Sequence, residues 1–166
     1  MGLTVSATTR EPRPGEIDGV SYHFMNDDEF DHRLEDGEFL EWAWVHGHRY
    51  GTLRSEVERV LAGGESVVLE IDVQGGLAVR SVVPDAVLVF IEPPSMEELE
   101  RRLRGRGTEE EEQVRLRLSN ARAEMGHAQE YDVRLVNDDL ERACSELQDV
   151  IRTYEMDGGP SQDVRD

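Results

Sequence analysis

The sequence has no lysine: all 18 of its basic residues are arginines, and they stand against 37 acidic residues. The formal charge of −19 argues against binding to nucleic acid or to an anionic membrane, because such surfaces attract through clustered basic side chains. Genomic bias or a high-salt habitat is the simplest cause of the missing lysine. The absence also has a consequence for catalysis, which follows from the motifs below.

Cysteine is nearly absent too. The single residue, Cys144, excludes an internal disulfide and a metal site built from several cysteines. We expect its thiol to be buried, because the segment LERACSELQDVI predicts an amphipathic helix with Cys144 on the apolar face. The sequence shows no signal peptide and no apolar run of transmembrane length, so we predict a soluble, cytoplasmic protein.

The 166 residues suit one domain with a sizeable core. From about residue 66 onward, predicted strands (66–73, 86–94, 133–137) alternate with predicted helices (74–83, 95–107, 109–132, 138–154). Such alternation is typical of a parallel sheet covered by helices on both faces.

The earlier part of the chain breaks this alternation. Residues 8–55 predict a small subdomain of mixed β structure with short strands and turns. The expected elements are strands at 3–7, 20–25 and 39–46, a helix at 26–37 that starts at Asn26 to Asp28, a turn at 49–52 and a helix at 53–64. Ser95, with Glu98 three residues on, predicts a capping box at the start of the helix over 95–107. The last ten residues, 157–166, predict a disordered tail.

The first segment that could carry chemistry is SATTREPRPGE, residues 6–16. Arg10 and Arg13 flank a proline-stiffened turn, and the hydroxyls of Ser6, Thr8 and Thr9 precede them. Arginine forks and neutral hydroxyl donors suit the oxygens of a phosphate. The alternative is an exposed loop whose arginines pair with the surplus carboxylates.

The second segment is FLEWAWVHGHRYGT, residues 39–52. Glu41 lies among apolar and aromatic residues, and Tyr50 and Thr52 follow after a turn. A buried carboxylate needs hydrogen-bond partners. Guanine offers two adjacent donors, its ring N–H and its exocyclic amine, which one carboxylate can accept together. The alternative is a solvent-facing glutamate on an alternating strand.

The third segment, VVLEIDVQGG, places Glu70 and Asp72 on one face of a predicted buried strand, at its carboxyl end. Ligands bind at that end of the strands in open α/β sheets. Two like charges on one face of a buried strand are unfavourable unless a ligand, a metal or arginines compensate them. This pair is therefore a candidate for a ligand site.

The fourth segment, ERRLRGRGTEEEEQVRLRL, is rich in arginine around a glycine-bounded turn. A mobile arginine-rich flap can neutralise the charge of a phosphoryl group in transfer. The alternative is a salt-bridged pair of surface helices. The arginines concerned are Arg101, Arg102, Arg104, Arg106, Arg115 and Arg117.

Six motifs, in this order and spacing, resemble the guanylate kinase family: SATTREPRPGEIDGVSYHF, EFLEWAWVHGHRYGT, LEIDVQGG, FIEPPS, RLRGRGTEEEE and YDVRLVNDDL. The likeness runs from about residue 3 to residue 155. It implies an α/β fold of the P-loop nucleoside-monophosphate-kinase type, with a parallel sheet between helices. It also implies one domain over 1–156, with a GMP-binding subdomain at about 8–55 and a helical lid at about 101–125.

The resemblance implies transfer of the terminal phosphoryl group of ATP to GMP, giving ADP and GDP, with Mg²⁺. This reaction belongs to purine nucleotide metabolism. The resemblance also assigns roles to individual residues by their positions in the motifs. The GMP-binding residues would be Ser6, Arg10, Arg13, Tyr22, Glu41, Tyr50, Thr52, Glu70 and Asp72. Catalytic arginines would be Arg13, Arg106 and Arg117, and Arg102, Arg106 and Asn137 would lie on the ATP and lid side. No residue is assigned as a metal ligand.

One departure concerns the ATP side. The family begins with a strand and a G-x-x-x-x-G-K-[ST] loop whose backbone and lysine hold ATP. That segment would lie just upstream of LTVSATTR, and the sequence contains no lysine. We therefore expect the first central strand and the P-loop to be absent from this chain, through N-terminal truncation or as a genuine feature.

Two other functions stay open. One is a catalytically inactive module that binds GMP or a phosphorylated peptide, and the other is a kinase for a different phosphorylated acceptor. The intact set that would read guanine, Glu41, Thr52 and Asp72, argues against a peptide and against another acceptor.

Overall fold

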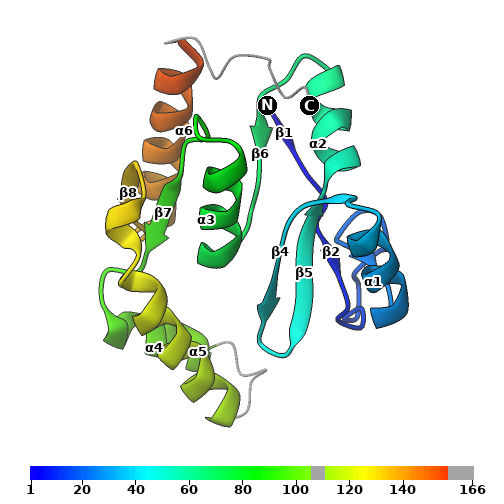
Figure 1. Ribbon diagram of the computed structural model, residues 1–166. Coiled ribbons are helices and arrows are strands. Elements are labelled where there is room, and N and C mark those ends of the chain that lie inside the picture. The colour runs from blue at the N-terminus through cyan, green and yellow to red at the C-terminus, as the bar shows by residue number, and fades with distance from the viewer. Residues whose placement is uncertain (106–110, 157–166) are drawn as a thin grey trace. The chain divides into compact units, whose positions relative to one another are not determined.

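The structure is a computed structural model that describes residues 1–105 and 111–156. Its chain forms two compact units, Met1–Pro84 and Asp85–Asp166. The fold is α/β, with parallel strand pairs in both units (Figure 1). The fold class predicted from the alternating pattern is confirmed at this level.

A four-stranded mixed sheet dominates the first unit, in the order β3-β2-β5-β4. The long strands β4 (Phe39–Val45) and β5 (His48–Leu53) form an antiparallel hairpin, drawn in cyan in Figure 1. The short strand β2 (Ala7–Thr8) pairs antiparallel with β5 and parallel with β3 (His23–Phe24). The predicted mixed β structure in this region is therefore present.

The hairpin turn lies earlier than the sequence suggested. Residues 49–52, predicted as a turn, belong to β5, and the reversal is made by His46 and Gly47. Both have positive φ angles, 51° and 86°. A two-residue hairpin loop needs this left-handed backbone to match the twist of its strands, and glycine at the second position adopts it without strain.

A second, two-stranded sheet pairs the start of the chain with its middle. Strand β1 (Gly2–Leu3) lies parallel to β6 (Val67–Val68). The predicted strand over 66–73 therefore ends at Val68, and the predicted strand over 3–7 is divided between β1 and β2. Helix α3 (Val73–Val82) begins soon after β6 because the Asp72 carboxylate caps it, accepting the Gly75 N–H at 2.9 Å.

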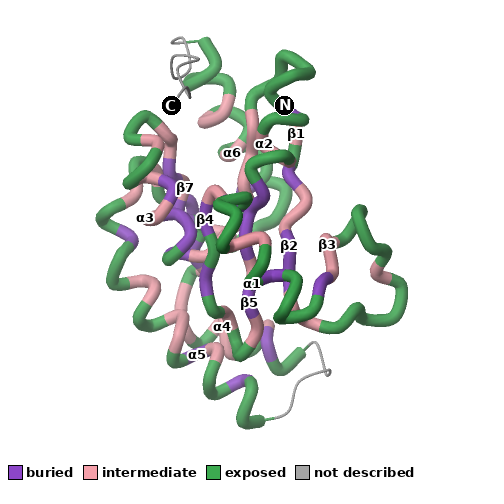
Figure 2. The backbone as a smooth tube through the Cα atoms, turned by 45° about the vertical axis from the view of Figure 1, so that its right-hand side comes forward, coloured by how far each residue is buried: buried purple, intermediate pink, exposed green. Residues whose placement is uncertain are grey.

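The core of the first unit forms between the mixed sheet and helix α1 (Asp27–Glu35). The helix starts where the sequence predicted, and Asn26 caps it by accepting the Glu29 N–H at 2.8 Å. The helix buries Phe30 against Phe39, with ring centroids 4.4 Å apart. Buried residues follow β2, β4 and β5, whereas most of α1 is exposed (Figure 2).

Arg49 ties the hairpin to α1. Its side chain is only 7% exposed, and its guanidinium binds the carboxylates of Asp27, at 2.7 Å, and Asp31. It also lies over the rings of Phe30 and Trp44, at 4.5 and 5.6 Å from their centroids. A planar, weakly hydrated guanidinium can stack and pair at once, which an ammonium does less well.

The second unit pairs β7 (Val89–Glu92) parallel with β8 (Val133–Val136). Helices α4 (Met96–Gly105) and α5 (Glu111–Met125) pack through a small apolar cluster of Leu103, Val114 and Leu118. The helix predicted over 109–132 ends at Met125, before Gly126, and a 3₁₀ turn (Ala128–Glu130) follows. The predicted cap of α4 is present, since Ser95 Oγ accepts the Glu98 N–H at 3.1 Å.

Helix α6 (Leu140–Met156) completes the second unit. In the first unit, helix α2 (Arg54–Ala62) follows β5. Cys144 on α6 is exposed, so the prediction of a buried thiol was wrong. The inward face of α6 carries Ala143, Leu147 and Val150, at the spacing of one helical stripe. Cys144 lies about 100° around the helix from Ala143 and points away from that stripe.

Within residues 1–105 and 111–156, no helix combines the length and apolar character that a membrane crossing requires. The predicted tail, 157–166, lies outside the described residues.

We expect Arg49→Ala to lower the free energy of unfolding by about 2–3 kcal/mol, because hydrogen bonds to charged groups and ring stacking are lost together. Urea denaturation measures this effect. The matched control is Arg33→Ala, which removes surface ion pairs with Glu29 and Glu38 and should cost about 0.5 kcal/mol. Equal losses for the two variants would contradict the role assigned to Arg49.

Candidate functional site

A pocket of about 550 Å³ opens in the first unit. Segments far apart in the sequence line it: residues 3–6, residues 20–22, the facing strands β4 and β5, and residues 70–72. Six of the nine residues predicted to bind GMP are among the lining residues: Ser6, Tyr22, Glu41, Tyr50, Glu70 and Asp72. The fold therefore gathers most of this predicted set around one cavity.

Glu41 is the buried charge in this pocket. It is 6% exposed and pairs with Thr52 across the hairpin. The Thr52 Oγ1 hydroxyl donates to Glu41 Oε1 at 2.6 Å. Burial raises the pKa of the Glu41 carboxyl, the Thr52 hydrogen bond opposes that shift, and the nearby negative charge of Asp72 adds to it. The alternative of a solvent-facing glutamate on β4 is therefore wrong.

Gly75 gives the Glu41 carboxylate its space. A Cβ atom on Gly75 would lie 2.7 Å from Glu41 Oε2, closer than side-chain packing permits. Sequence reasoning did not single out Gly75. The signal available was its place in the glycine pair that follows Asp72.

Asp72 borders the same pocket but does not lie on a strand. Its Oδ1 caps α3, and its Oδ2 accepts from Gln74 Nε2 at 3.0 Å. Glu70 is exposed and also follows the end of β6. The expectation that both acids share one face of a buried strand was wrong, because the strand stops at Val68. Both nevertheless reach the pocket.

Arg10 connects the N-terminal loop with two tyrosines of the pocket. Its Nε donates to the Tyr50 hydroxyl at 3.3 Å, and its guanidinium lies 5.3 Å from the centroid of the Tyr22 ring. The two tyrosine rings meet edge to face at 5.9 Å. Burial is the main cause that raises the pKa of Tyr22, so its hydroxyl stays protonated and available as a donor.

Glu16 binds both arginines of the N-terminal loop, and sequence reasoning did not single it out. Its carboxylate accepts from Arg10 Nη2 at 2.9 Å and from the Arg13 N–H at 2.7 Å. The Arg10 hydrogen bond is the main cause that lowers the pKa of Glu16. The expected alternative, in which arginines of this loop pair with carboxylates, therefore describes Arg10, whereas the Arg13 side chain is exposed.

The predicted lid and ATP-side residues lie in the second unit. Arg102 Nη1 donates to the Asn137 carbonyl at 2.8 Å, and Arg102 Nε donates to Glu98 at 2.7 Å. The fold thus brings Arg102 and Asn137 together, and their contact uses the backbone oxygen of Asn137 rather than its side chain. Arg117 is half-buried on α5, and Arg106 lies outside the described residues.

The other arginines of this segment form surface ion pairs. Arg101 binds Glu98, and Arg104 joins α4 to α5 through Glu111, which also binds Arg115. These pairs lower the pKa of Glu111 to about 2, with Arg104 as the main cause. The alternative of a salt-bridged helix pair therefore describes Arg101, Arg104 and Arg115.

Parallel strand pairs followed by helices, with a polar pocket beside a small mixed sheet, define an α/β fold of the nucleoside monophosphate kinase class. The family model for guanylate kinase matches residues 1–154. The chain belongs to the guanylate kinase family, as its sequence motifs predicted.

Individual relatives agree with this assignment. A guanylate kinase of Thermobifida fusca is 54% identical over 145 residues, which cover 87% of this chain and 74% of the relative. One from Sphingopyxis alaskensis is 50% identical over 157 residues, 94% of this chain and 71% of the relative. The crystal structure of guanylate kinase from Anaplasma phagocytophilum superposes with a TM-score of 0.80 at 35% identity, covering 93% of this chain and 76% of the other.

The raised pKa of Glu41 predicts a pH-dependent stability. An acid whose pKa is raised by folding contributes stability that is full below its ordinary value of 4.5 and is lost as pH rises through the folded pKa. Glu41→Gln removes this loss while keeping an acceptor for Thr52. We expect the variant to gain stability relative to the parent between pH 4 and pH 8, measured by urea denaturation. A constant difference across that range would contradict the prediction.

We expect Gly75→Ala to lower the free energy of unfolding by about 1–3 kcal/mol, because the added methyl displaces the Glu41 carboxylate. A helix position would otherwise favour alanine over glycine. The control is Gly105→Ala, where an added Cβ meets no atom within 4 Å. Thermal melts of both variants measure the effect, and a stabilised Gly75→Ala would show that Glu41 can move without cost.

Proposed function

We propose that the chain binds GMP in the pocket of the first unit and acts in the transfer of the terminal phosphoryl group of ATP to GMP, giving ADP and GDP. The observation that carries the proposal is the buried Glu41 carboxylate, held by Thr52 beside Asp72. Guanine presents two adjacent N–H donors that such acceptors can receive. Adenine presents a ring nitrogen acceptor in the corresponding place, which a carboxylate repels.

Arginine and hydroxyl groups would hold the phosphate of GMP. In this proposal Ser6, Tyr22 and Tyr50 donate hydroxyl hydrogen bonds, and Arg10 and Arg13 supply positive charge. The Tyr50 hydroxyl and the Glu16 carboxylate already orient Arg10. An incoming phosphate dianion therefore competes with Glu16 for this guanidinium.

Phosphoryl transfer needs charge neutralisation more than covalent chemistry. We propose that Arg13, Arg106 and Arg117 spread the charge of the moving group, and that Arg102 and Asn137 lie on the ATP side of the reaction. The lid boundaries, about 101–125, and the acceptor subdomain, about 8–55, are part of the same proposal.

Mg²⁺ would enter with the phosphates of ATP and screen their charge. It keeps several waters and takes one or two carboxylates besides nucleotide phosphate. The exposed Glu70 carboxylate at the pocket fits that chemistry. Across residues 1–105 and 111–156 there is no group of three or more candidate ligands, so the phosphates would supply most of the metal's contacts.

A second candidate function is binding without turnover. The observation that favours it is the absence of lysine from the sequence, which leaves the family's ATP-binding lysine without a counterpart in these 166 residues. Such a module would bind GMP or a phosphorylated peptide. The guanine-directed acceptors favour GMP. Action in the cytoplasm, in purine nucleotide metabolism, stays a prediction from the sequence.

Calorimetry with GMP and AMP tests the acceptor site. We expect GMP to bind at least about tenfold more tightly than AMP, because AMP leaves buried acceptors without donors. Glu41→Gln should remove most of this preference, since an amide cannot accept two donors with both of its heteroatoms. Equal binding of the two nucleotides by the parent chain would contradict the assignment of the pocket.

A coupled assay for ADP on the same sample separates the two candidate functions. Turnover that depends on GMP supports the kinase and shows that the reaction proceeds without a lysine. GMP binding without turnover supports the binding module.

A further inference from the structure

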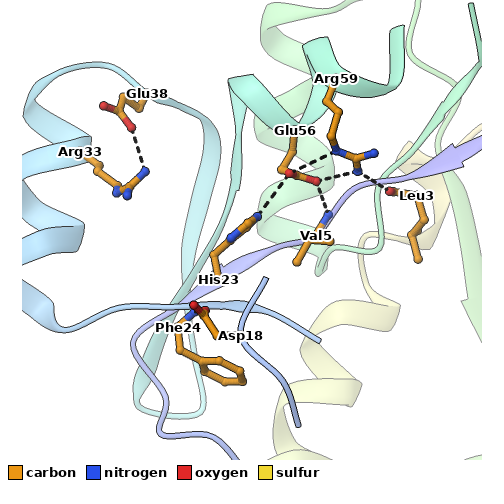
Figure 3. A network of polar contacts seen from close by, with 9 residues as sticks. All are labelled: Leu3, Val5, Asp18, His23, Phe24, Arg33, Glu38, Glu56 and Arg59. Atoms are coloured by element: carbon orange, nitrogen blue, oxygen red, sulfur yellow. Dashed lines mark hydrogen bonds and ion pairs between the residues drawn. The ribbon is translucent and has the colours of Figure 1, made fainter. Parts of the chain in front are cut away.

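Glu56, on helix α2, lies at the centre of a polar network with Val5, His23 and Arg59 (Figure 3). Its Oε2 accepts the backbone N–H of Val5 at 2.9 Å and Nη2 of Arg59 at 2.8 Å. Its Oε1 lies 3.3 Å from His23 Nε2. Arg59 Nη2 also donates to the Leu3 carbonyl at 3.3 Å. Glu56 itself does not border the pocket of about 550 Å³.

The groups that Glu56 holds come from separate parts of the pocket wall. Val5 precedes Ser6, and both border the pocket. His23 follows Tyr22, and its backbone N–H donates to the Ser6 carbonyl at 2.9 Å. Helix α2 continues directly from β5, which carries Tyr50. One carboxylate thus joins the three segments that bring Ser6, Tyr22 and Tyr50 to the cavity.

The charge of Glu56 is fixed by these contacts. The Arg59 hydrogen bond is the main cause that lowers its pKa to about 2, burial opposes the shift, and the Val5 N–H and His23 add to it. The side chain is 12% exposed. Both oxygens face donors, so the carboxylate acts as a fixed support rather than as a ligand for a substrate.

We propose that Glu56 is a positioning residue for the phosphate side of the acceptor pocket. The proposal rests on the proposed binding of GMP. Glu56 acts through Val5 and His23 on Ser6 and Tyr22, which would donate to the phosphate. The guanine-directed group around Glu41 has other contacts, which come from Thr52 on β5 and Gly75 on α3.

Glu56→Gln tests this role with little change in volume. An amide nitrogen in place of Oε2 would face the Val5 N–H and Arg59 Nη2, and one in place of Oε1 would face Arg59 Nε at 3.4 Å, so either orientation puts a donor against a donor. The substitution therefore weakens the contact that holds Val5 and the adjacent Ser6 in the pocket wall. We expect the affinity for GMP to fall about tenfold, because hydrogen bonds to a charged group are lost. The affinity for guanosine, which lacks the phosphate, should change less than twofold.

The experiment measures GMP by calorimetry and guanosine by NMR titration, at a temperature where far-ultraviolet circular dichroism shows every variant folded. The matched control is Glu58→Gln, an exposed carboxylate on the same helix, which should leave both affinities unchanged. Arg59→Gln is the second variant: it keeps Glu56 and its Val5 contact but removes the link to Leu3. It should weaken GMP binding in the same direction by a smaller factor.

The outcomes separate the two proposals. If the parent chain binds no GMP, the proposed function fails and the role of Glu56 fails with it. If the parent binds GMP and Glu56→Gln weakens GMP and guanosine equally, Glu56 supports the fold only and the positioning role is overturned. Unchanged GMP affinity in Glu56→Gln overturns it too. Should Glu56→Gln not fold, Arg59→Gln decides: unchanged GMP affinity overturns the proposal, and a selective loss for GMP supports it.

Discussion

The hydrogen bond between Thr52 and the buried carboxylate of Glu41 is the constraint on which the pocket depends. A carboxylate loses solvation when it is buried, and only well-placed donors offset that loss. The hairpin register places Thr52 opposite Glu41. The absence of a side chain on Gly75 leaves room for the second oxygen. The β4–β5 hairpin and the start of α3 therefore both accommodate the Glu41 carboxylate in the pocket.

Arginine makes most of the ion pairs among the described residues, and the sequence contains no lysine to share them. Arg49 lies over two aromatic rings while it binds acids of α1, and Arg59 joins Glu56 to the first strand. Arg102 holds two backbone carbonyls after β8. A planar guanidinium with five donors can serve several partners at fixed angles, which suits a sequence rich in carboxylates.

Membership in the guanylate kinase family gives these local observations a common setting. The match extends over residues 1–154, and the Thermobifida fusca relative is 54% identical. The pocket gathers Ser6, Tyr22, Glu41 and Tyr50 from motifs that the sequence separates by up to 44 positions. Glu16, Gly75 and Glu56 add contacts that those motifs do not display. Each contacts another residue of the site: Gly75 lies against Glu41 and Glu56 binds Val5, which both line the pocket, and Glu16 binds Arg10.

The sequence by itself determined the family, the α/β class and the order of most elements, because motif spacing, helix caps and apolar periodicity are local properties. Ser95 caps its helix as predicted, and α1 starts at the predicted acidic segment with Asn26 as its cap. The tertiary structure decided what depends on distant neighbours. It ended β6 at Val68, since the Asp72 side chain caps α3 instead of extending a strand. It buried Glu41, exposed Cys144 and paired Arg10 with Glu16. The burial of Glu41 depends on β5 and α3, which meet β4 only in the folded chain, so no local pattern could predict it.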